Sequence, residues 1–384
     1  IFKKLYEAGY AKYIDMPVNW CEELGTVLSN DEVIDGKSER GGYPVIRKNM
    51  KQWVIDQPAF AEKLLKGLNE IDWPESTKEI QRNWIGKSIG VEVEFEIVGG
   101  GKFSIFTTCI ETIYGITFMV LAPDGDIVKG LLDRVENRDE VEAYIAETLK
   151  KNDMDRTELN KTKSGCQLKG ITCINPVNGK EVSLFIGDFV LASYGTGAVM
   201  AVPSHDQRDF EYAIAHNIEM IQVIEGRDVS ECAFEKHDYL GKGCKLINSE
   251  EFTGLTVEEA KEAITVKLEK MGVAKRVVNY HFREWIFARQ RYWGEPVPCV
   301  HKEDGSIYFL PDEELPLVLP ELDDYKGKGG KAPLENATEW KNYDANGVKG
   351  VRETSTMPGS AGSSWYYMRY IDPDNDKEFA NQAL

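Results

Sequence analysis

Apolar and polar residues alternate most regularly between residues 91 and 108. Residues 91–98 read Val-Glu-Val-Glu-Phe-Glu-Ile-Val, a period of two that predicts a half-buried strand. Three glycines follow at 99–101, and residues 103–108 return as a second strand, so this stretch predicts a β-hairpin. Four further segments have the pattern of strands: 117–121, 170–174, 181–192 and 198–202.

Helical spacing of apolar residues is clearest in two segments of the same region. Residues 141–149 place their apolar side chains on one helix face. Thr256 precedes Glu259 by three residues, a capping box that predicts the start of a helix, and Gly272 is expected to end that helix.

The two ends of the chain differ from this central region in their pattern of apolar residues. Residues 1–86 are expected to be mainly helical, with a helical pattern over 50–71 that Pro58 divides. Short helices are expected at 78–85 and 365–370. We therefore divide the chain into segments 1–87, 88–279 and 280–384. The predicted fold class is mixed α/β, with a barrel-like central domain and peripheral helices inserted into a host domain.

Composition and charge narrow the class of protein. The 384 residues are 42% hydrophobic and 29% charged, which is typical of a folded, water-soluble enzyme, and no run is apolar enough to cross a membrane. The formal net charge is −18, so any RNA site must be a small basic island. The chain begins Ile-Phe-Lys-Lys without a signal peptide, which favours a cytoplasmic fragment of a longer protein.

The cysteines predict no metal site. Seven cysteines are scattered along the chain without a Cys-x-x-Cys pair and without a histidine beside them at zinc-finger spacing. Reduced, mostly buried thiols are the expected state.

Two polar segments carry the candidate chemistry. The first, residues 107–112, reads Thr-Thr-Cys-Ile-Glu-Thr at the end of the second hairpin strand. The second follows the strand at 198–202 and contributes six candidates: Met200, Val202, His205, Asp206, Arg208 and Asp209. Taken singly, each segment is also compatible with an ordinary strand end or a solvated loop.

Together these segments resemble the editing domain of leucyl-tRNA synthetases. Residues 195–209 match the family's Gly-Thr-Gly-Ala-Val-Met-x-Val-Pro-x-His-Asp-x-Arg-Asp at every fixed position, and Gly195-Thr196-Gly197 forms its opening turn. Four flanking stretches resemble the same family: 17–21, 81–86, 289–294 and 357–367.

The resemblance implies an architecture and a reaction. The family inserts its editing domain into a class I, Rossmann-like catalytic domain, and the whole enzyme attaches leucine to tRNA-Leu with ATP and Mg. Its ATP-binding motifs are expected outside this sequence. The central domain is expected to hydrolyse mischarged tRNA-Leu without a cofactor or a metal, as a monomer that contacts no membrane.

The resemblance also implies residue roles. Asp209 is expected to bind the substrate's α-ammonium, while Thr107 and Thr108 position water and polarise the ester. Thr112 is the expected size gate against leucine. The remaining candidates line the site: Met200 and Val202 as apolar walls, His205 and Asp206 as substrate-binding residues, and Arg208 toward the tRNA. For His205 a structural hydrogen-bonding role is the alternative.

Three residues depart from the family pattern. Cys109 stands where the family has Arg, Ile110 where it has Pro, and Glu111 where it has Asp. Two hypotheses therefore stay open: an editing hydrolase, or a non-catalytic tRNA-binding module whose pocket has degenerated.

Overall fold

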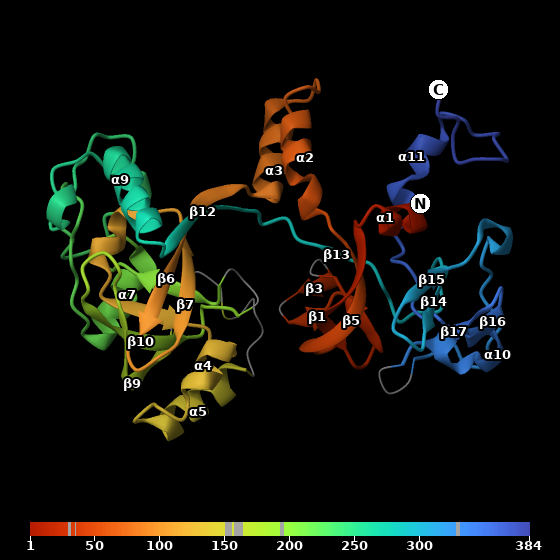
Figure 1. Ribbon diagram of the computed structural model, residues 1–384, viewed down its shortest axis with the longest axis horizontal. Coiled ribbons are helices and arrows are strands. Elements are labelled where there is room, and N and C mark those ends of the chain that lie inside the picture. The colour runs from red at the N-terminus through yellow and green to blue at the C-terminus, as the bar shows by residue number, and fades with distance from the viewer. Residues whose placement is uncertain (30–31, 35, 150–155, 157–163, 193–195, 328–330) are drawn as a thin grey trace. The chain divides into compact units, whose positions relative to one another are not determined.

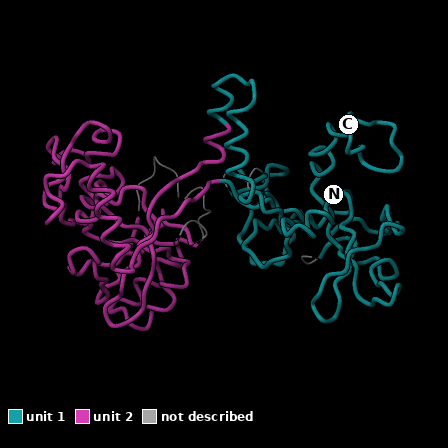
Figure 2. The backbone as a smooth tube through the Cα atoms, turned by 45° about the horizontal axis from the view of Figure 1, so that its top comes forward, with its two compact units in different colours: residues 1–80, 282–384 teal, residues 81–281 magenta. Residues whose placement is uncertain are grey.

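The computed structural model describes the chain except for residues 30–31, 35, 150–155, 157–163, 193–195 and 328–330 (Figure 1). Gly195 of the predicted turn lies outside the described residues. The chain divides into two units, coloured separately in Figure 2. Unit 1 comprises residues 1–80 and 282–384, and unit 2 comprises residues 81–281.

Unit 2 is built on one sheet with helices around it. Its strands are β6 (Ser88–Ile97), β7 (Lys102–Thr107), β8 (Phe118–Leu121), β9 (Gly165–Ile174), β10 (Glu181–Gly187), β11 (Ala198–Ala201) and β12 (Ala274–Asn279). Its α-helices include α4 (Asp126–Leu131), α5 (Arg138–Thr148), α7 (Gln207–His216), α8 (Lys236–Tyr239) and α9 (Val257–Lys270), and two short 3₁₀ helices are η3 (Ile110–Gly115) and η4 (Glu250–Phe252).

The hairpin and the capped helix are confirmed. Strands β6 and β7 pair antiparallel from Val91↔Thr107 to Glu96↔Lys102, and the three glycines between them all have positive φ. The apolar residues of β6 at alternate positions, including Val93 and Phe95, are buried in the core. Thr256 caps α9 and exchanges hydrogen bonds with Glu259, which is the predicted capping box.

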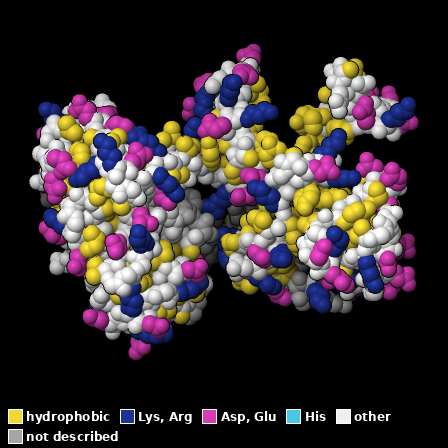
Figure 3. All heavy atoms as spheres, viewed as in Figure 1, with side chains coloured by type: hydrophobic (Ala, Val, Ile, Leu, Met, Phe, Trp, Pro, Cys, Tyr) yellow, Lys and Arg dark blue, Asp and Glu magenta, His cyan; other side chains and the backbone are white. Residues whose placement is uncertain are grey.

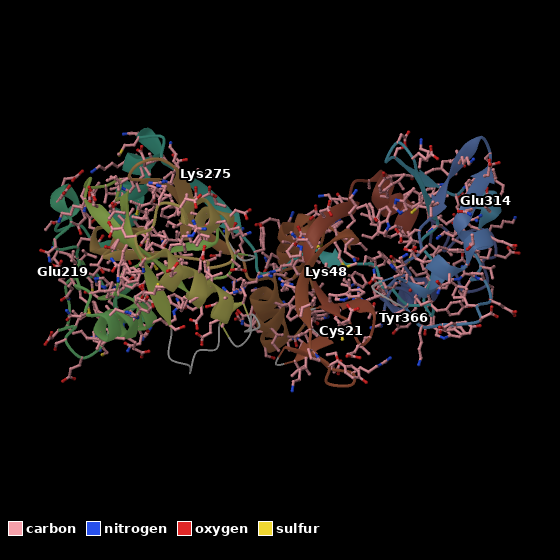
Figure 4. All side chains as sticks on the ribbon, turned by 90° about the horizontal axis from the view of Figure 1, so that it is seen from below. Cys21, Lys48, Glu219, Lys275, Glu314 and Tyr366 are labelled. Atoms are coloured by element: carbon pink, nitrogen blue, oxygen red, sulfur yellow. The ribbon has the colours of Figure 1, made fainter. Side chains whose placement is uncertain are left out.

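The sheet curls without closing into a barrel. Its order is β11-β8-β10-β9-β6, with β7 on the free edge of β6 and β12 sharing the other edge with β9. Lys275 of β12, labelled in Figure 4, pairs with Glu92 of β6 at 3.0 Å. Strands β7 and β11 lie in contact, yet the described residues form no backbone ladder between them. The expected barrel is therefore an open, curved sheet.

Strand directions bring two strand ends together. The successive pairings make β7 and β11 run in the same direction. Because these strands are also neighbours, their C-terminal residues, Thr107 and Ala201, lie at the same end of the sheet. The polar segments that follow both strands therefore emerge at one rim.

Unit 1 contains more strand than the sequence predicted. Its strands are β1 (Ala11–Cys21), β2 (Thr26–Leu28), β3 (Val33–Ile34), β4 (Lys37–Ser38), β5 (Ile46–Ile55), β13 (Trp285–Ile286), β14 (Cys299–Lys302), β15 (Ile307–Phe309), β16 (Asn342–Ala345) and β17 (Val348–Arg352). Its helices are short: α1 (Phe2–Glu7), η2 (Pro58–Phe60), α2 (Ala61–Gly67), η5 (Asp312–Glu314), η6 (Pro333–Asn336), α10 (Thr338–Lys341), η7 (Gly362–Ser364) and α11 (Tyr366–Arg369), while α3 (Glu75–Ile85) crosses into unit 2.

The mainly helical expectation for residues 1–86 is wrong. Strands β1 and β5 pair antiparallel along their length, from Ala11↔Ile55 to Trp20↔Ile46. The apolar residues at 53–55 that suggested a helix are instead all buried in β5. Cross-strand pairing and burial outweigh local helical spacing here. The parallel sheet of a Rossmann-like domain is not among the described strands of unit 1, whose pairs are antiparallel.

A buried glutamate connects the two four-stranded sheets of unit 1, β13-β5-β1-β2 and β15-β14-β17-β16. Glu353 follows β17, and its Oε2 accepts hydrogen bonds from Trp53 Nε1 at 2.9 Å and from His301 Nε2 at 2.8 Å. Its Oε1 accepts from the backbone N–H of Ser355 at 2.8 Å. Burial alone would raise the pKa of Glu353, but the hydrogen bond and charge of His301 hold it below the ordinary value.

We predict that Glu353→Ala destabilises unit 1 by about 3 kcal/mol or more, because the indole N–H of Trp53 and the His301 ring lose a buried partner. Urea unfolding followed by tryptophan fluorescence measures the change. Exposed Glu303→Ala is the matched control and should have little effect. Equal stability of the two variants would contradict the assigned role of Glu353.

Candidate functional site

The segment after β7 folds into a tight threonine loop, residues 107–112. Thr107 Oγ1 accepts a hydrogen bond from the backbone N–H of Cys109 at 3.0 Å. Thr112 is buried in η3, and its Oγ1 donates to the Cys109 carbonyl at 2.8 Å. Both hydroxyls are therefore fixed on the backbone of one residue, which holds the loop and the Thr112 rotamer in place.

Asp209 is a buried carboxylate at the start of a helix. It lies in the first turn of α7, where the positive end of the helix dipole favours a negative charge. Its Oδ2 accepts a hydrogen bond from the backbone N–H of Val202 at 2.8 Å, directly after β11. Only 7% of the residue is exposed.

Opposing effects act on the pKa of Asp209. Burial raises its pKa well above the ordinary value, and the neighbouring charge of Asp206 raises it further. The Val202 N–H and the charge of Arg208 act in the opposite direction. A cation that reaches this carboxylate would restore its charge, so the group is suited to bind an ammonium.

Asp206 and Arg208 are engaged with each other and with the helix. Asp206 is the N-cap of α7, and its side chain accepts from the backbone N–H groups of Arg208 and Asp209. The Arg208 guanidinium lies 3.3 Å from Asp206 Oδ2 and remains largely exposed. In this arrangement Asp206 shapes the helix start, while Arg208 is available at the surface.

His205 uses both ring nitrogens inside the fold. Nδ1 lies 3.1 Å from the Phe234 carbonyl, and Nε2 accepts from the backbone N–H of Val223 at 3.0 Å. These partners assign the proton to Nδ1, and burial lowers the pKa of the ring to about 4. Because both ring nitrogens have backbone partners, this arrangement favours the structural alternative for His205 over the expected substrate-binding role.

The threonine loop and the Asp209 segment share one core. Ile105, Ile110 and Val202 belong to the same buried cluster, with Met200 packed against it. Apolar side chains from both polar segments therefore contribute to one buried core.

Segment 233–239 joins the two sides of the site. On the Asp209 side, Glu235 Oε1 accepts from the backbone N–H of Gln207 at 3.1 Å. On the other side, the Tyr239 hydroxyl donates to Glu111 Oε1 at 3.4 Å, and Lys236 Nζ lies 3.4 Å from Thr108 Oγ1. This bridge was not predicted, because nothing local in residues 233–239 marks it.

Glu111 and Cys109 are buried beside this bridge. Glu111 is fully buried, and burial raises its pKa despite the charges of Lys261 and Lys236. Its Oε2 has no hydrogen-bond partner within the described parts of the chain. Burial and the charge of Glu111 also raise the pKa of the Cys109 thiol, so this cysteine is a neutral group.

A second cluster, in unit 1, has the chemistry of metal ligands. Donor atoms of Cys299, His301 and Glu353 lie within 4.8 Å of one another. Sequence reading missed the Cys-x-His pair at 299–301, whose side chains share one face of β14. Both carboxylate oxygens of Glu353 already accept protein hydrogen bonds, so these residues are accounted for by the packing of unit 1.

Comparisons with known proteins agree with this geometry. The family model for the leucyl-tRNA synthetase editing domain matches residues 82–269. The crystal structure of the ternary complex of Agrobacterium radiobacter K84 agnB2 LeuRS, tRNA and LeuAMS matches with a TM-score of 0.77 at 31% sequence identity. The match covers 97% of this chain and 43% of that one, so the chain spans less than half the length of that LeuRS.

The mixed α/β fold and these matches relate the chain to the aminoacyl-tRNA synthetases. More narrowly, the chain belongs to the leucyl-tRNA synthetase family and carries that family's editing domain in residues 82–269. No described helix is both long enough and apolar enough to cross a membrane.

We predict that His205 makes unit 2 sensitive to acid. Its folded pKa of about 4 lies below the unfolded value of about 6.5, so its contribution is full above pH 6.5 and is lost as pH falls toward 4. Between pH 7 and pH 5 the loss should be about 2 kcal/mol.

Urea unfolding of wild type and His205→Ala at both pH values tests this assignment. The variant should be less stable at pH 7 by about 2 kcal/mol, because two buried backbone groups lose their partner, and the gap should narrow at pH 5. Exposed His237→Ala serves as the control. A gap that is the same at both pH values would refute the neutral, structural role.

Proposed function

We propose that unit 2 hydrolyses the ester between a wrong amino acid and tRNA-Leu. The observation that supports the proposal is that the threonine loop and the segment carrying the buried Asp209 carboxylate follow neighbouring strands at one end of a single sheet. Binding alone discriminates poorly between amino acids that differ by one methyl group, and a second, hydrolytic site corrects the errors that remain.

Asp209 binds the α-ammonium of the substrate. An aminoacyl ester keeps a free ammonium, whereas water and neutral metabolites have no such group. The contact is charge-assisted, and it orients the ester relative to the helix start. Val202 N–H keeps the carboxylate in position before the substrate arrives.

Thr107 and Thr108 position water and the ester carbonyl. Both lie where β7 ends, and the hydrogen bond from Cys109 N to Thr107 Oγ1 orders this turn. No side chain in the set serves as an evident general base, since His205 is neutral and fully engaged. Holding water and ester in attack geometry supplies a large part of the rate in such a site.

Thr112 excludes leucine. Its hydroxyl is fixed on the Cys109 carbonyl, so the side chain cannot rotate away to enlarge the space. Met200 and Val202 provide apolar walls, Asp206 supports the helix start, and Arg208 faces the tRNA. Editing in this scheme requires neither a cofactor nor a metal.

The longer enzyme is proposed to attach leucine to tRNA-Leu with ATP and Mg, as a monomer in the cytoplasm. This chain matches 43% of the length of the LeuRS structure described above, and the proposal for the whole enzyme rests on that likeness. The loss of the family's arginine at Cys109 supports the second candidate, a tRNA-binding module without hydrolysis. A direct assay decides between them.

We predict that Asp209→Asn lowers kcat/KM for release of norvaline or isoleucine from mischarged tRNA-Leu by about 30-fold, equivalent to about 2 kcal/mol for a lost charged contact. Wild type should lose activity as pH falls through the raised pKa of Asp209, because only the carboxylate binds the ammonium.

Asp206→Asn keeps the helix cap but removes the charge that raises the pKa of Asp209. The acid limb of its pH profile should therefore move to lower pH. Hydrolysis by wild type with no effect of Asp209→Asn would exclude Asp209, and no hydrolysis by wild type would favour the tRNA-binding module.

We predict that Thr112→Ala permits hydrolysis of correctly charged leucyl-tRNA-Leu, because it removes the fixed side chain that restricts the space. Norvalyl-tRNA hydrolysis should persist, whereas a bulky replacement such as Thr112→Phe should suppress both reactions. Deacylation time courses with labelled leucine and norvaline measure both outcomes. Intact leucyl-tRNA in the presence of Thr112→Ala would show that another residue is the gate.

A further inference from the structure

Two lysines reach the threonine loop from separate elements. Lys236 of α8 places Nζ 3.4 Å from Thr108 Oγ1, and Lys261 of α9 donates from Nζ to the Thr108 carbonyl at 2.6 Å. Both side chains are half-buried. Two positive charges therefore converge on one residue of the proposed catalytic loop.

Neither lysine has a carboxylate within ion-pair distance in the part of the chain that the structure describes. Other cations nearby do: Lys267 pairs with Glu251 at 2.6 Å, and Arg276 pairs with Glu262 at 2.7 Å. The chain has 64 acidic and 46 basic residues, so acidic partners are plentiful. On the face shown in Figure 3, positive and negative side chains are likewise interspersed.

Glu111 forms no ion pair with either lysine. Its Oε1 accepts from the Tyr239 hydroxyl, and burial raises its pKa although the charges of both lysines act in the opposite direction. Cys109 contributes no charge, since its thiol pKa is also raised. The two ammonium groups at the threonine loop therefore have no ion-pair partner among the described residues.

We infer that Lys236 and Lys261 form a phosphodiester subsite for the 3′-terminal nucleotides of the tRNA. The inference rests on the proposed function, which places the ester on the adjacent threonines. The ammonium group of a lysine lies at the end of a flexible side chain and can bind a backbone phosphate by charge. Such a contact does not distinguish one base from another. The subsite is the small basic island that a chain of net charge −18 needs in order to hold RNA.

The two lysines have different secondary roles. Lys261 also fixes the Thr108 carbonyl, so it orders the loop as well as binding phosphate. The contact of Lys236 is a longer one to a hydroxyl, which leaves its ammonium freer to meet a ligand.

Binding of uncharged tRNA-Leu to the whole chain tests the subsite. Lys236→Gln and Lys261→Gln remove the charges, Lys236→Arg and Lys261→Arg keep them, and Lys270→Gln in the exposed last turn of α9 is the matched control. Fluorescence anisotropy at several KCl concentrations gives Kd and its salt dependence.

Each Gln variant should weaken binding about 5-fold at 0.1 M salt and reduce the slope of log Kd against log [KCl] by about one. The Arg variants and Lys270→Gln should behave as wild type. With tRNA-Leu that lacks its three terminal nucleotides, the difference between wild type and the Gln variants should vanish.

A salt slope unchanged by either Gln variant would overturn the subsite, even if deacylation proceeds normally. A fall in kcat with unchanged Kd and slope would also overturn it, because the lysines would then only order the loop. If wild type shows no hydrolysis but the slopes change as expected, the subsite stands and the hydrolase proposal fails.

Discussion

The buried carboxylate of Asp209 is the constraint on which the site depends. A carboxylate that is 7% exposed must be compensated, and the fold does so with the Val202 N–H, the start of α7 and the charge of Arg208, whereas the charge of Asp206 acts against it. These groups stabilise the charge only in part, since the pKa of Asp209 stays raised. This incomplete compensation is the physical basis of the ammonium-binding role proposed for Asp209.

The threonine loop differs from the Asp209 segment in its charge. The hydroxyls of Thr107 and Thr112 hydrogen-bond to the backbone of Cys109 and fix the shape of the loop, while Lys236 and Lys261 bring positive charge to Thr108 from two other elements. The ammonium-binding role proposed for Asp209 and the phosphate-binding role proposed for the lysines therefore fall on two different segments. The ends of β7 and β11 bring the two polar segments to one rim of the sheet, and residues 233–239 hydrogen-bond to both.

Local sequence patterns were sufficient to predict the elements whose conformation depends on residues close together in the chain. The period-two pattern with three glycines predicted the β6–β7 hairpin, because alternation and positive φ are local requirements. Thr256 and Glu259 predicted the start of α9 for the same reason. Across the candidate site, the sequence marked both polar segments, but it did so through their likeness to a family rather than through physical necessity.

Alternation of polarity, the turns that need glycine and the positions of the polar segments can all be read from the order of residues. Three features required the folded chain: residues 50–55 form a strand, both ring nitrogens of His205 bond to the backbone of Phe234 and Val223, and Lys236 and Lys261 contact Thr108. The reason is physical: burial, cross-strand pairing and uncompensated charge depend on neighbours distant in the chain, and no local pattern encodes them.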